Sequence, residues 1–108
     1  MADKKTLKEI QKVIDEWILK HGGYWPPLSM LSGIVEELGE LAREINYLEG
    51  FKPKKSLKPP KKESFIGEEL GDLLFSIICL ANHYKVDLNE KVHKTFKKYV
   101  KRDATRFI

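Results

Sequence analysis

The sequence predicts an all-α protein, a four-helix bundle formed by one domain. Apolar residues recur at intervals of three and four in four segments, and no segment alternates with the period of a strand. The connecting stretches are short, which favours antiparallel packing of neighbouring helices. The chain has 108 residues, the size of one domain, which we assign to residues 1–108.

The first two helices are delimited by residues with known end preferences. The first should begin at Thr6, because Thr6 and Glu9 have the spacing of a capping box. It should end before glycines 22–23, since glycine tolerates the left-handed backbone of a helix C-terminus. The second helix is expected from about Leu28 to Leu48, after a rigid connector that contains two prolines.

The second half of the chain predicts a loop and two more helices. Residues 52–62 contain six lysines and three prolines, which argue against a stable helix and indicate a Lys/Pro-rich loop. The third helix is expected from about Ser64 to Tyr84, and the fourth from Asp87, which has a Glu three residues later. The expected inward face of the fourth helix comprises Leu88, Val92, Phe96 and Tyr99.

Composition and charge exclude several classes of protein. The hydrophobic fraction of 42% is too high for a wholly disordered chain, and the longest nearly apolar run, residues 73–81, is too short to cross a membrane. The start of the chain lacks the apolar stretch of a secretory signal, and one cysteine allows no internal disulfide, so we expect a cytoplasmic protein. Cys79 is expected inside a packed helix, not as a nucleophile.

The net charge of +4 comes from the Lys/Pro-rich loop, residues 52–62. Without this loop the chain has a net charge of −2.

The acidic residues are concentrated in the middle of the sequence. Nine of the sixteen acids lie between residues 36 and 72, and five of these form two clusters on the second and third helices. Residues three or four positions apart share a helix face, so antiparallel helices would bring the two clusters to one volume. Such crowding is unfavourable without a cation, whereas carboxylate oxygens suit Mg²⁺. The five residues are Glu36, Glu37, Glu40, Glu69 and Asp72.

A glycine interrupts each acidic cluster. The frames Glu-Glu-Leu-Gly-Glu at 36–40 and Glu-Glu-Leu-Gly-Asp at 68–72 are nearly identical, and each places a glycine inside a helix. Glycine costs roughly 1 kcal/mol relative to alanine at such a position. Gly39 and Gly71 therefore suggest either that the helices approach closely or that a bulky group passes the backbone.

The spacing of the acids resembles a known signature. Glu36-Glu37-x-x-Glu40, a spacer of 28 residues and Glu69-x-x-Asp72 resemble the motif of the MazG-type nucleotide pyrophosphohydrolases, in the all-α NTP pyrophosphohydrolase superfamily. The Lys/Pro-rich loop accounts for a spacer at the long end of the family range. Further similarity to the small single-domain, YpjD-like branch is carried by residues 23–28, 36–46, 50–55, 79–82 and 101–103.

This resemblance implies hydrolysis of a nucleoside triphosphate to the monophosphate and pyrophosphate, as a house-cleaning reaction that removes unwanted nucleotides. It implies a requirement for Mg²⁺, for which Mn²⁺ could substitute, with Glu37, Glu40, Glu69 and Asp72 as metal ligands. Glu36 matches the first glutamate of the motif. It either binds a further metal ion or orients and deprotonates the attacking water, and the sequence does not choose between these roles.

Basic and aromatic residues are candidates for substrate binding. Cations recur every four residues on the fourth helix, from Lys94 to Arg106, and this stripe is equally compatible with an ordinary solvated face. Arginine suits bidentate phosphate contacts, and the base needs an apolar wall with a few polar groups. The candidates are Arg102, Lys98, Lys54 and Lys55 for phosphate and Trp25 and Asn82 for the base.

We expect a homodimer or homotetramer, with no membrane and no nucleic acid as partner, from the resemblance and from the small core of so short a chain. Two other classes of function remain. A nucleic-acid-binding module could use residues 52–62 and the fourth helix, although the acidic clusters would then be unexplained. A non-catalytic helical oligomerisation protein could retain the motif without turnover.

Overall fold

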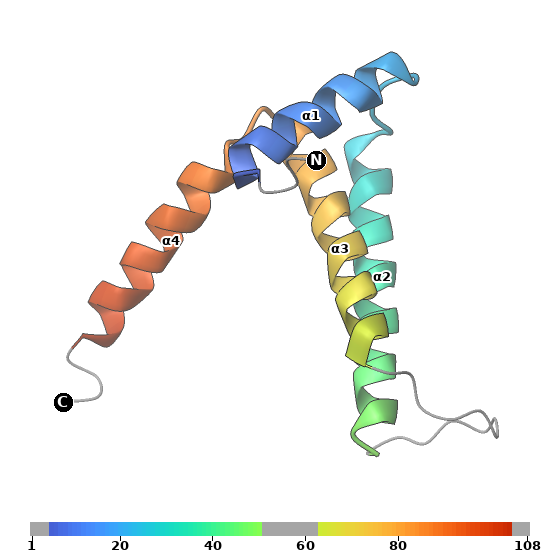
Figure 1. Ribbon diagram of the computed structural model, residues 1–108, viewed down its shortest axis with the longest axis vertical. Coiled ribbons are helices and arrows are strands. Elements are labelled where there is room, and N and C mark those ends of the chain that lie inside the picture. The colour runs from blue at the N-terminus through green and yellow to red at the C-terminus, as the bar shows by residue number, and fades with distance from the viewer. Residues whose placement is uncertain (1–4, 51–62, 105–108) are drawn as a thin grey trace. The chain divides into compact units, whose positions relative to one another are not determined.

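The computed structural model describes residues 5–50 and 63–104, which contain four helices (Figure 1). These are α1 (Leu7–Lys20), α2 (Pro27–Leu48), α3 (Glu63–His83) and α4 (Leu88–Asp103). Within the described ranges there is no strand. The predicted all-α fold and the order and extent of its four helices are thereby confirmed, whereas the predicted Lys/Pro-rich loop lies outside the described residues.

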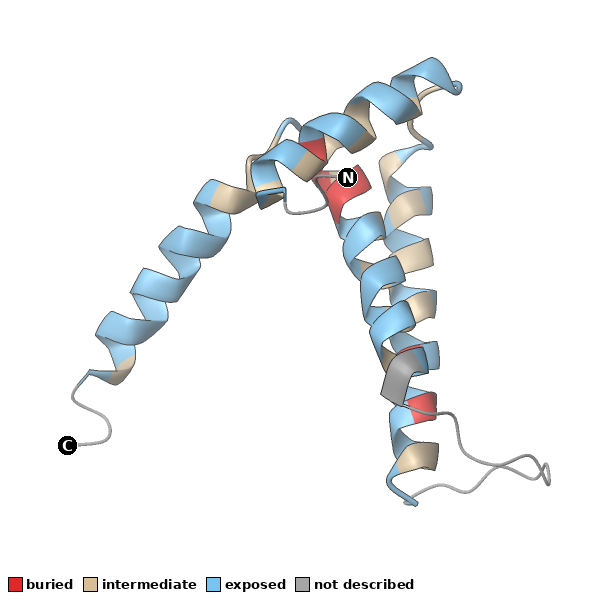
Figure 2. Cartoon of the chain, viewed as in Figure 1, coloured by how far each residue is buried: buried red, intermediate tan, exposed pale blue. Residues whose placement is uncertain are grey.

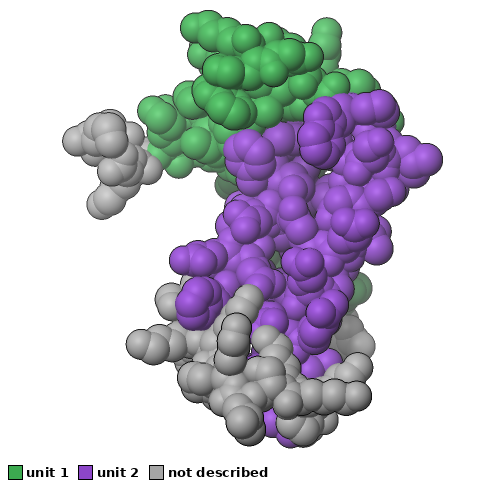
Figure 3. All heavy atoms as spheres, turned by 90° about the vertical axis from the view of Figure 1, so that its right-hand side faces the viewer, with its two compact units in different colours: residues 1–24, 81–108 green, residues 25–80 purple. Residues whose placement is uncertain are grey.

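The chain divides into two compact units, shown in separate colours in Figure 3. Unit 1 consists of residues 1–24 and 81–108, and therefore contains α1, the last turn of α3 and α4. Unit 2 consists of residues 25–80, with α2 and the rest of α3. Unit 1 is assembled from the two ends of the sequence, so its contacts join residues that are far apart in the chain.

The N-terminus of α1 has the predicted capping box. The Thr6 hydroxyl accepts a hydrogen bond from the Glu9 backbone N–H at 3.1 Å, and the Glu9 carboxylate accepts one from the Thr6 N–H at 3.1 Å. These hydrogen bonds from Thr6 lower the pKa of the Glu9 carboxyl group below its ordinary value, because they stabilise its charged form. At the other end of α1, Gly22 has a φ of +108°, a conformation that favours glycine.

A buried glutamine joins the three segments of unit 1. Gln11 is only 6% exposed, and its Nε2 donates to Asn82 Oδ1 at 3.0 Å and to the Val86 carbonyl at 2.9 Å. Its Oε1 accepts from the Leu88 backbone N–H at 2.9 Å, and Asn82 Nδ2 donates to the Gln11 carbonyl at 3.0 Å. The side chains of Gln11 and Asn82 together therefore satisfy polar groups on α1, at the end of α3 and at the start of α4.

Replacing Gln11 with Ala is expected to destabilise the protein by about 1–3 kcal/mol, because partners in unit 1 would be left without a hydrogen bond. The loss should appear as a lower urea midpoint in unfolding followed by circular dichroism. Glu16→Ala, an exposed position on the same helix, is the control and should change stability little. Equal stability of the two variants would contradict the assigned role.

In unit 2, α2 and α3 run antiparallel (Figure 1). A hydrogen bond joins them: Ser76 Oγ on α3 contacts both carboxylate oxygens of Glu37 on α2, at 3.3 and 3.4 Å. This contact fixes which turns of the two helices face each other. The predicted antiparallel arrangement of the helices that carry the acids is therefore present.

Few apolar side chains are buried in the described part of the chain (Figure 2). The buried apolar residues there are Leu41, Ile78, Cys79 and Ala81. Of the four residues predicted to face inward on α4, Leu88 is half-buried, and the prediction is wrong for the other three within unit 1. Val92, Phe96 and Tyr99 are exposed, Phe96 by 69%, because no described segment of unit 1 covers them. The physical consequence is a hydrophobic surface far larger than the core.

The glycines of the acidic clusters have open space beside them. A Cβ atom added at Gly39 or Gly71 would meet no side chain or neighbouring element within 4 Å. Close helix packing against either glycine, one of the two readings of the sequence, is therefore not found within the chain. The other reading, that space is kept for a group passing the backbone, is compatible with this geometry.

Candidate active site

Three of the candidate carboxylates lie in the middle of α2. Glu37 is half-buried because it faces α3, where Ser76 donates to it, whereas Glu36 and Glu40 are exposed. Positions 37 and 40 are separated by one helical turn and so share the face of α2 that is directed at α3. Glu36 lies four positions before Glu40 and so shares a helix face with it, and both residues are exposed.

The other two candidate carboxylates lie on α3, on the N-terminal side of Ser76. Asp72 precedes Ser76 by one turn, and Glu40 follows Glu37 by about one turn. Because the helices are antiparallel and Ser76 contacts Glu37, Glu40 and Asp72 fall at the same level of the helix pair. Glu69, which is half-buried, lies about one turn further along α3.

Sequence reasoning missed one carboxylate of this face. Glu44 is only 8% exposed and lies one turn beyond Glu40 on α2. By the same antiparallel register it falls at the level of Glu69, and both residues have interaction partners within the structure. The signal was present in the sequence, since 37, 40 and 44 follow the spacing of one helix face.

The chemistry of these donors fits a hard divalent cation, since all are carboxylate oxygens. Within the described residues, however, no three His, Cys, Asp or Glu side chains converge closely enough to hold a metal ion. The helices therefore place the carboxylates in one register without closing a cage around an ion. The side chains of Glu40 and Asp72 are both exposed.

The candidate phosphate ligands on α4 are held near an aromatic ring of unit 1. Arg102 and Lys98 lie 4.5 and 5.0 Å from the centre of the Tyr99 ring. Arg102 also donates to both carboxylate oxygens of Asp103, at 2.8 and 2.9 Å, and Lys94 pairs with Glu90 at 2.9 Å. These cations belong to unit 1 and the acids to unit 2, so their phosphate contacts remain predictions.

The remaining candidates for substrate binding differ in whether their side chains are accessible to a ligand. Both polar atoms of the Asn82 side chain are bonded to Gln11, which gives Asn82 a structural role, and its contact with a base stays a prediction. Trp25, at the start of unit 2, is 73% exposed and its ring is accessible. Lys54 and Lys55 lie outside the described residues.

Cys79 lies inside a packed helix, as predicted. It is 8% exposed, and burial raises the pKa of its thiol because the charged thiolate is poorly solvated there. A raised thiol pKa disfavours the nucleophilic thiolate form at neutral pH. Cys79 is therefore not equipped for covalent catalysis.

Comparison with protein families identifies the class of this fold and acidic motif. The model of the MazG nucleotide pyrophosphohydrolase domain matches residues 26–107, which include both acidic clusters. The chain belongs to the MazG nucleotide pyrophosphohydrolase family. It is accordingly an enzyme of the nucleotide pyrophosphohydrolase class.

Relatives in the MazG family support this assignment. The chain is 43% identical to YpjD of Bacillus subtilis over 108 residues, which are 99% of this chain and 94% of YpjD. It is 30% identical to mouse dCTP pyrophosphatase 1 over 93 residues, 84% of this chain but only 55% of the mouse protein. The chain thus spans about half the length of that relative.

Solved structures share the fold as well. The crystal structure of YpjD from Bacillus subtilis superimposes with a TM-score of 0.75 at 42% identity, covering 90% of this chain and 97% of YpjD. That of a Bacillus-conserved MazG protein, a nucleotide pyrophosphohydrolase, gives a TM-score of 0.72 at 39% identity, covering 90% of this chain and 92% of that protein. Among the described residues, no helix of this MazG-family chain is long and apolar enough to span a membrane.

Proposed function

We propose that this MazG-family enzyme hydrolyses nucleoside triphosphates or deoxynucleoside triphosphates to the monophosphate and pyrophosphate in a Mg²⁺-dependent reaction. The observation that carries the proposal is the register of the two acidic helices. The contact between Ser76 and Glu37 places Glu40 and Asp72 at one level of the helix pair. Removal of unwanted nucleotides is the physiological purpose that we assign to this reaction.

Four carboxylates are proposed to hold the metal: Glu37, Glu40, Glu69 and Asp72. When bound, Mg²⁺ neutralises the triphosphate and lowers the pKa of a coordinated water, and Mn²⁺ can substitute for it. The chain supplies orientation: the Ser76 hydroxyl holds the Glu37 carboxylate toward α3. Glu36 remains assigned to one of two tasks, binding a further metal ion or accepting the proton of the attacking water.

The substrate is proposed to contact residues outside the acidic clusters. Arg102 and Lys98 supply positive charge for phosphate oxygens not held by metal, together with Lys54 and Lys55 from the Lys/Pro-rich loop. Trp25 offers an exposed ring on which a base can stack, and Asn82 is the polar candidate for the base. Open space beside Gly39 and Gly71 leaves room for substrate next to the acids.

The partner proposed for the exposed apolar surface is a second copy of the chain. The described residues bury only four apolar side chains, which is too little for a stable domain by itself. Every copy carries the same exposed stripe on α4, so a symmetric association covers it in both copies at once. We therefore propose a homodimer, or a homotetramer formed from two such dimers.

The proposed compartment is the cytoplasm. The one cysteine is a free thiol, as is usual where glutathione and thioredoxin keep thiols reduced.

Incubation with a panel of nucleoside triphosphates and deoxynucleoside triphosphates tests the reaction. With Mg²⁺ or Mn²⁺ we expect release of pyrophosphate and the monophosphate in equal amounts, and EDTA should stop the reaction because the carboxylates then lack their ion. Cytosine nucleotides should be examined first, because mouse dCTP pyrophosphatase 1 is among the relatives of this chain. Absence of cleavage with either metal, or cleavage unaffected by EDTA, would contradict the proposal.

A further inference from the structure

Unit 1 contains an open surface pocket of about 290 Å³, and all of its lining residues belong to unit 1. Its walls come from the first half of α1, the end of α3 and the connection to α4, all within unit 1. The volume is close to the lower limit of about 300–1,000 Å³ for small-molecule sites. The cavity therefore suits a small ligand, and its lining indicates which kind.

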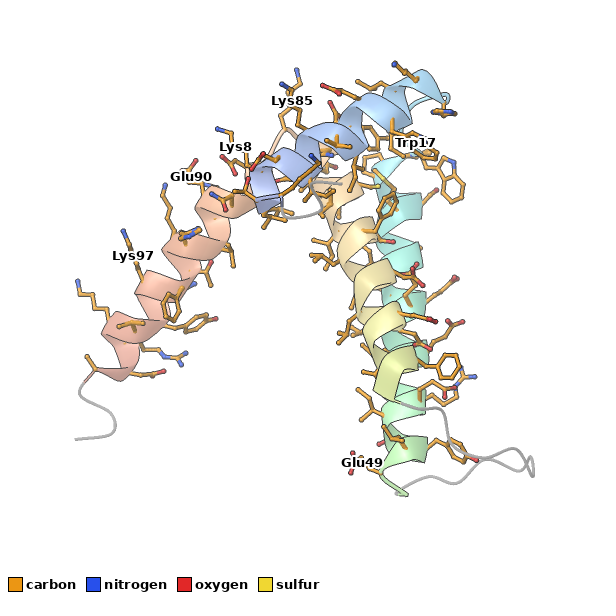
Figure 4. The ribbon with its side chains drawn as sticks, viewed as in Figure 1. Lys8, Trp17, Glu49, Lys85, Glu90 and Lys97 are labelled. Carbon is orange, nitrogen blue, oxygen red and sulfur yellow. The ribbon has the colours of Figure 1, made fainter. Side chains whose placement is uncertain are left out.

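Three lysines line this cavity, which we call the lysine pocket: Lys8, Lys12 and Lys85. Lys8 and Lys12 are one turn apart on α1 and thus share a helix face. Lys85 follows α3, and its φ of +57° is unusual for a residue with a side chain. Figure 4 shows Lys8 and Lys85 extending to the same side of unit 1.

The lysines of the lysine pocket outnumber its acidic residues. None of its three lysines forms an ion pair with any residue of the described ranges. The pocket also contains Asp15 and Asp87, but both carboxylates already accept hydrogen bonds. The Tyr24 hydroxyl donates to Asp15, and the Glu90 backbone N–H donates to Asp87 at 3.1 Å. These hydrogen bonds leave both carboxylates charged, so three lysines and two aspartates give the pocket a formal net charge of +1.

The wall of the lysine pocket is held in place by the buried hydrogen bonds of unit 1. Gln11 and Asn82 both line it, and their side chains connect α1, the end of α3 and the start of α4. The backbone segments that carry the lysines are thereby fixed relative to one another. A ligand would not have to order them, which reduces the entropic cost of binding.

We propose that the lysine pocket binds a small phosphate anion such as pyrophosphate, independently of the metal site. Ammonium groups are effective point charges for phosphate oxygens, and three lysines line this open pocket. The two aspartates and the small volume disfavour a long polyanion. The site requires no divalent metal, which separates it from the acidic site of unit 2, where the carboxylates repel anions unless a metal is bound.

Titration of the full-length protein with pyrophosphate in EDTA tests the proposal. Binding is measured by calorimetry at low, constant ionic strength, and the site is located by ¹H–¹⁵N NMR. We expect saturable binding and chemical-shift changes at Lys8, Gln11 and Lys85. Absence of saturable binding, or shifts confined to α2 and the acidic turns of α3, would overturn the proposal.

A matched pair of variants separates the pocket from general surface charge. Combining Lys8→Gln, Lys12→Gln and Lys85→Gln should weaken binding by at least about tenfold. The control combines Lys20→Gln, Lys97→Gln and Lys101→Gln, which removes the same charge from exposed positions outside the pocket and should retain the affinity. Equal losses in the two variants would overturn the proposal, and circular dichroism verifies that both are folded.

Discussion

Glu40→Gln and Asp72→Asn are each expected to abolish nucleotide hydrolysis while the helical circular dichroism signal remains. Each change removes a proposed charged oxygen ligand from the level of the helix pair that the two residues share, so metal binding should fail. Without the metal ion, the transition state loses several kcal/mol of charge stabilisation, so the rate of nucleotide hydrolysis should fall by at least about 10³-fold. The measurement is pyrophosphate release with saturating Mg²⁺, together with Mn²⁺ affinity by calorimetry.

Stability distinguishes this prediction from simple misfolding. Removing one charge from a crowded group of carboxylates relieves repulsion, so the thermal midpoint without metal should be unchanged or higher. Glu16→Gln, an exposed acid on α1 outside the proposed site, is the control and should retain activity. Activity surviving in both Glu40→Gln and Asp72→Asn would refute the ligand assignment.

Phe96→Glu is expected to dissociate the proposed homo-oligomer. Phe96 is 69% exposed in the single chain and lies in the apolar stripe of α4. Burying a phenylalanine contributes about 1.5–3 kcal/mol, and an unpaired carboxylate in its place adds a desolvation penalty. The dissociation constant should therefore rise by at least about a hundredfold, which sedimentation or light scattering after size exclusion measures.

The polar face of the same helix supplies the control for this experiment. Lys97 is next to Phe96 in the sequence, but it is exposed and lies outside the apolar stripe. Lys97→Glu therefore introduces the same side chain as Phe96→Glu at a position that faces solvent. Phe96→Leu keeps an apolar side chain and should preserve the assembly. A monomeric wild-type protein, or identical assembly of wild type and Phe96→Glu, would show that no second copy covers this stripe.

The N-terminal caps of α1 and α4 show how much of a helix end can be predicted from the local sequence. At α1 the Thr6–Glu9 capping box formed in full. At α4 only half of the expected pair formed: Asp87 accepts from the Glu90 N–H, whereas the Glu90 carboxylate pairs with Lys94. That pairing lowers the pKa of Glu90 and raises that of Lys94, because each charge stabilises the other. The spacing of a capping box does not predict which of two nearby partners the glutamate side chain will bind.

Long-range polar contacts were beyond prediction from the pattern of residues. Gln11 bonds to partners 71 to 77 positions away, and nothing around it in sequence distinguishes it from an ordinary surface glutamine. Asn82 was assigned to base recognition from its place on the helix that bears the acids, yet its amide is bonded to Gln11. The acidic residues proposed as ligands could be selected from the sequence because their spacing is local to each helix, and their role stays a prediction.

The sequence alone determined the four helices, their limits and the two acidic faces, because capping bonds, glycine backbone preferences and helical periodicity all act within a few residues. Tertiary structure alone decided which side chains meet. It set the register of the acids through the Ser76 contact with Glu37, and it buried Gln11. It also left the apolar stripe of α4 uncovered within one chain, since a periodic pattern states which face is apolar but not what packs against it.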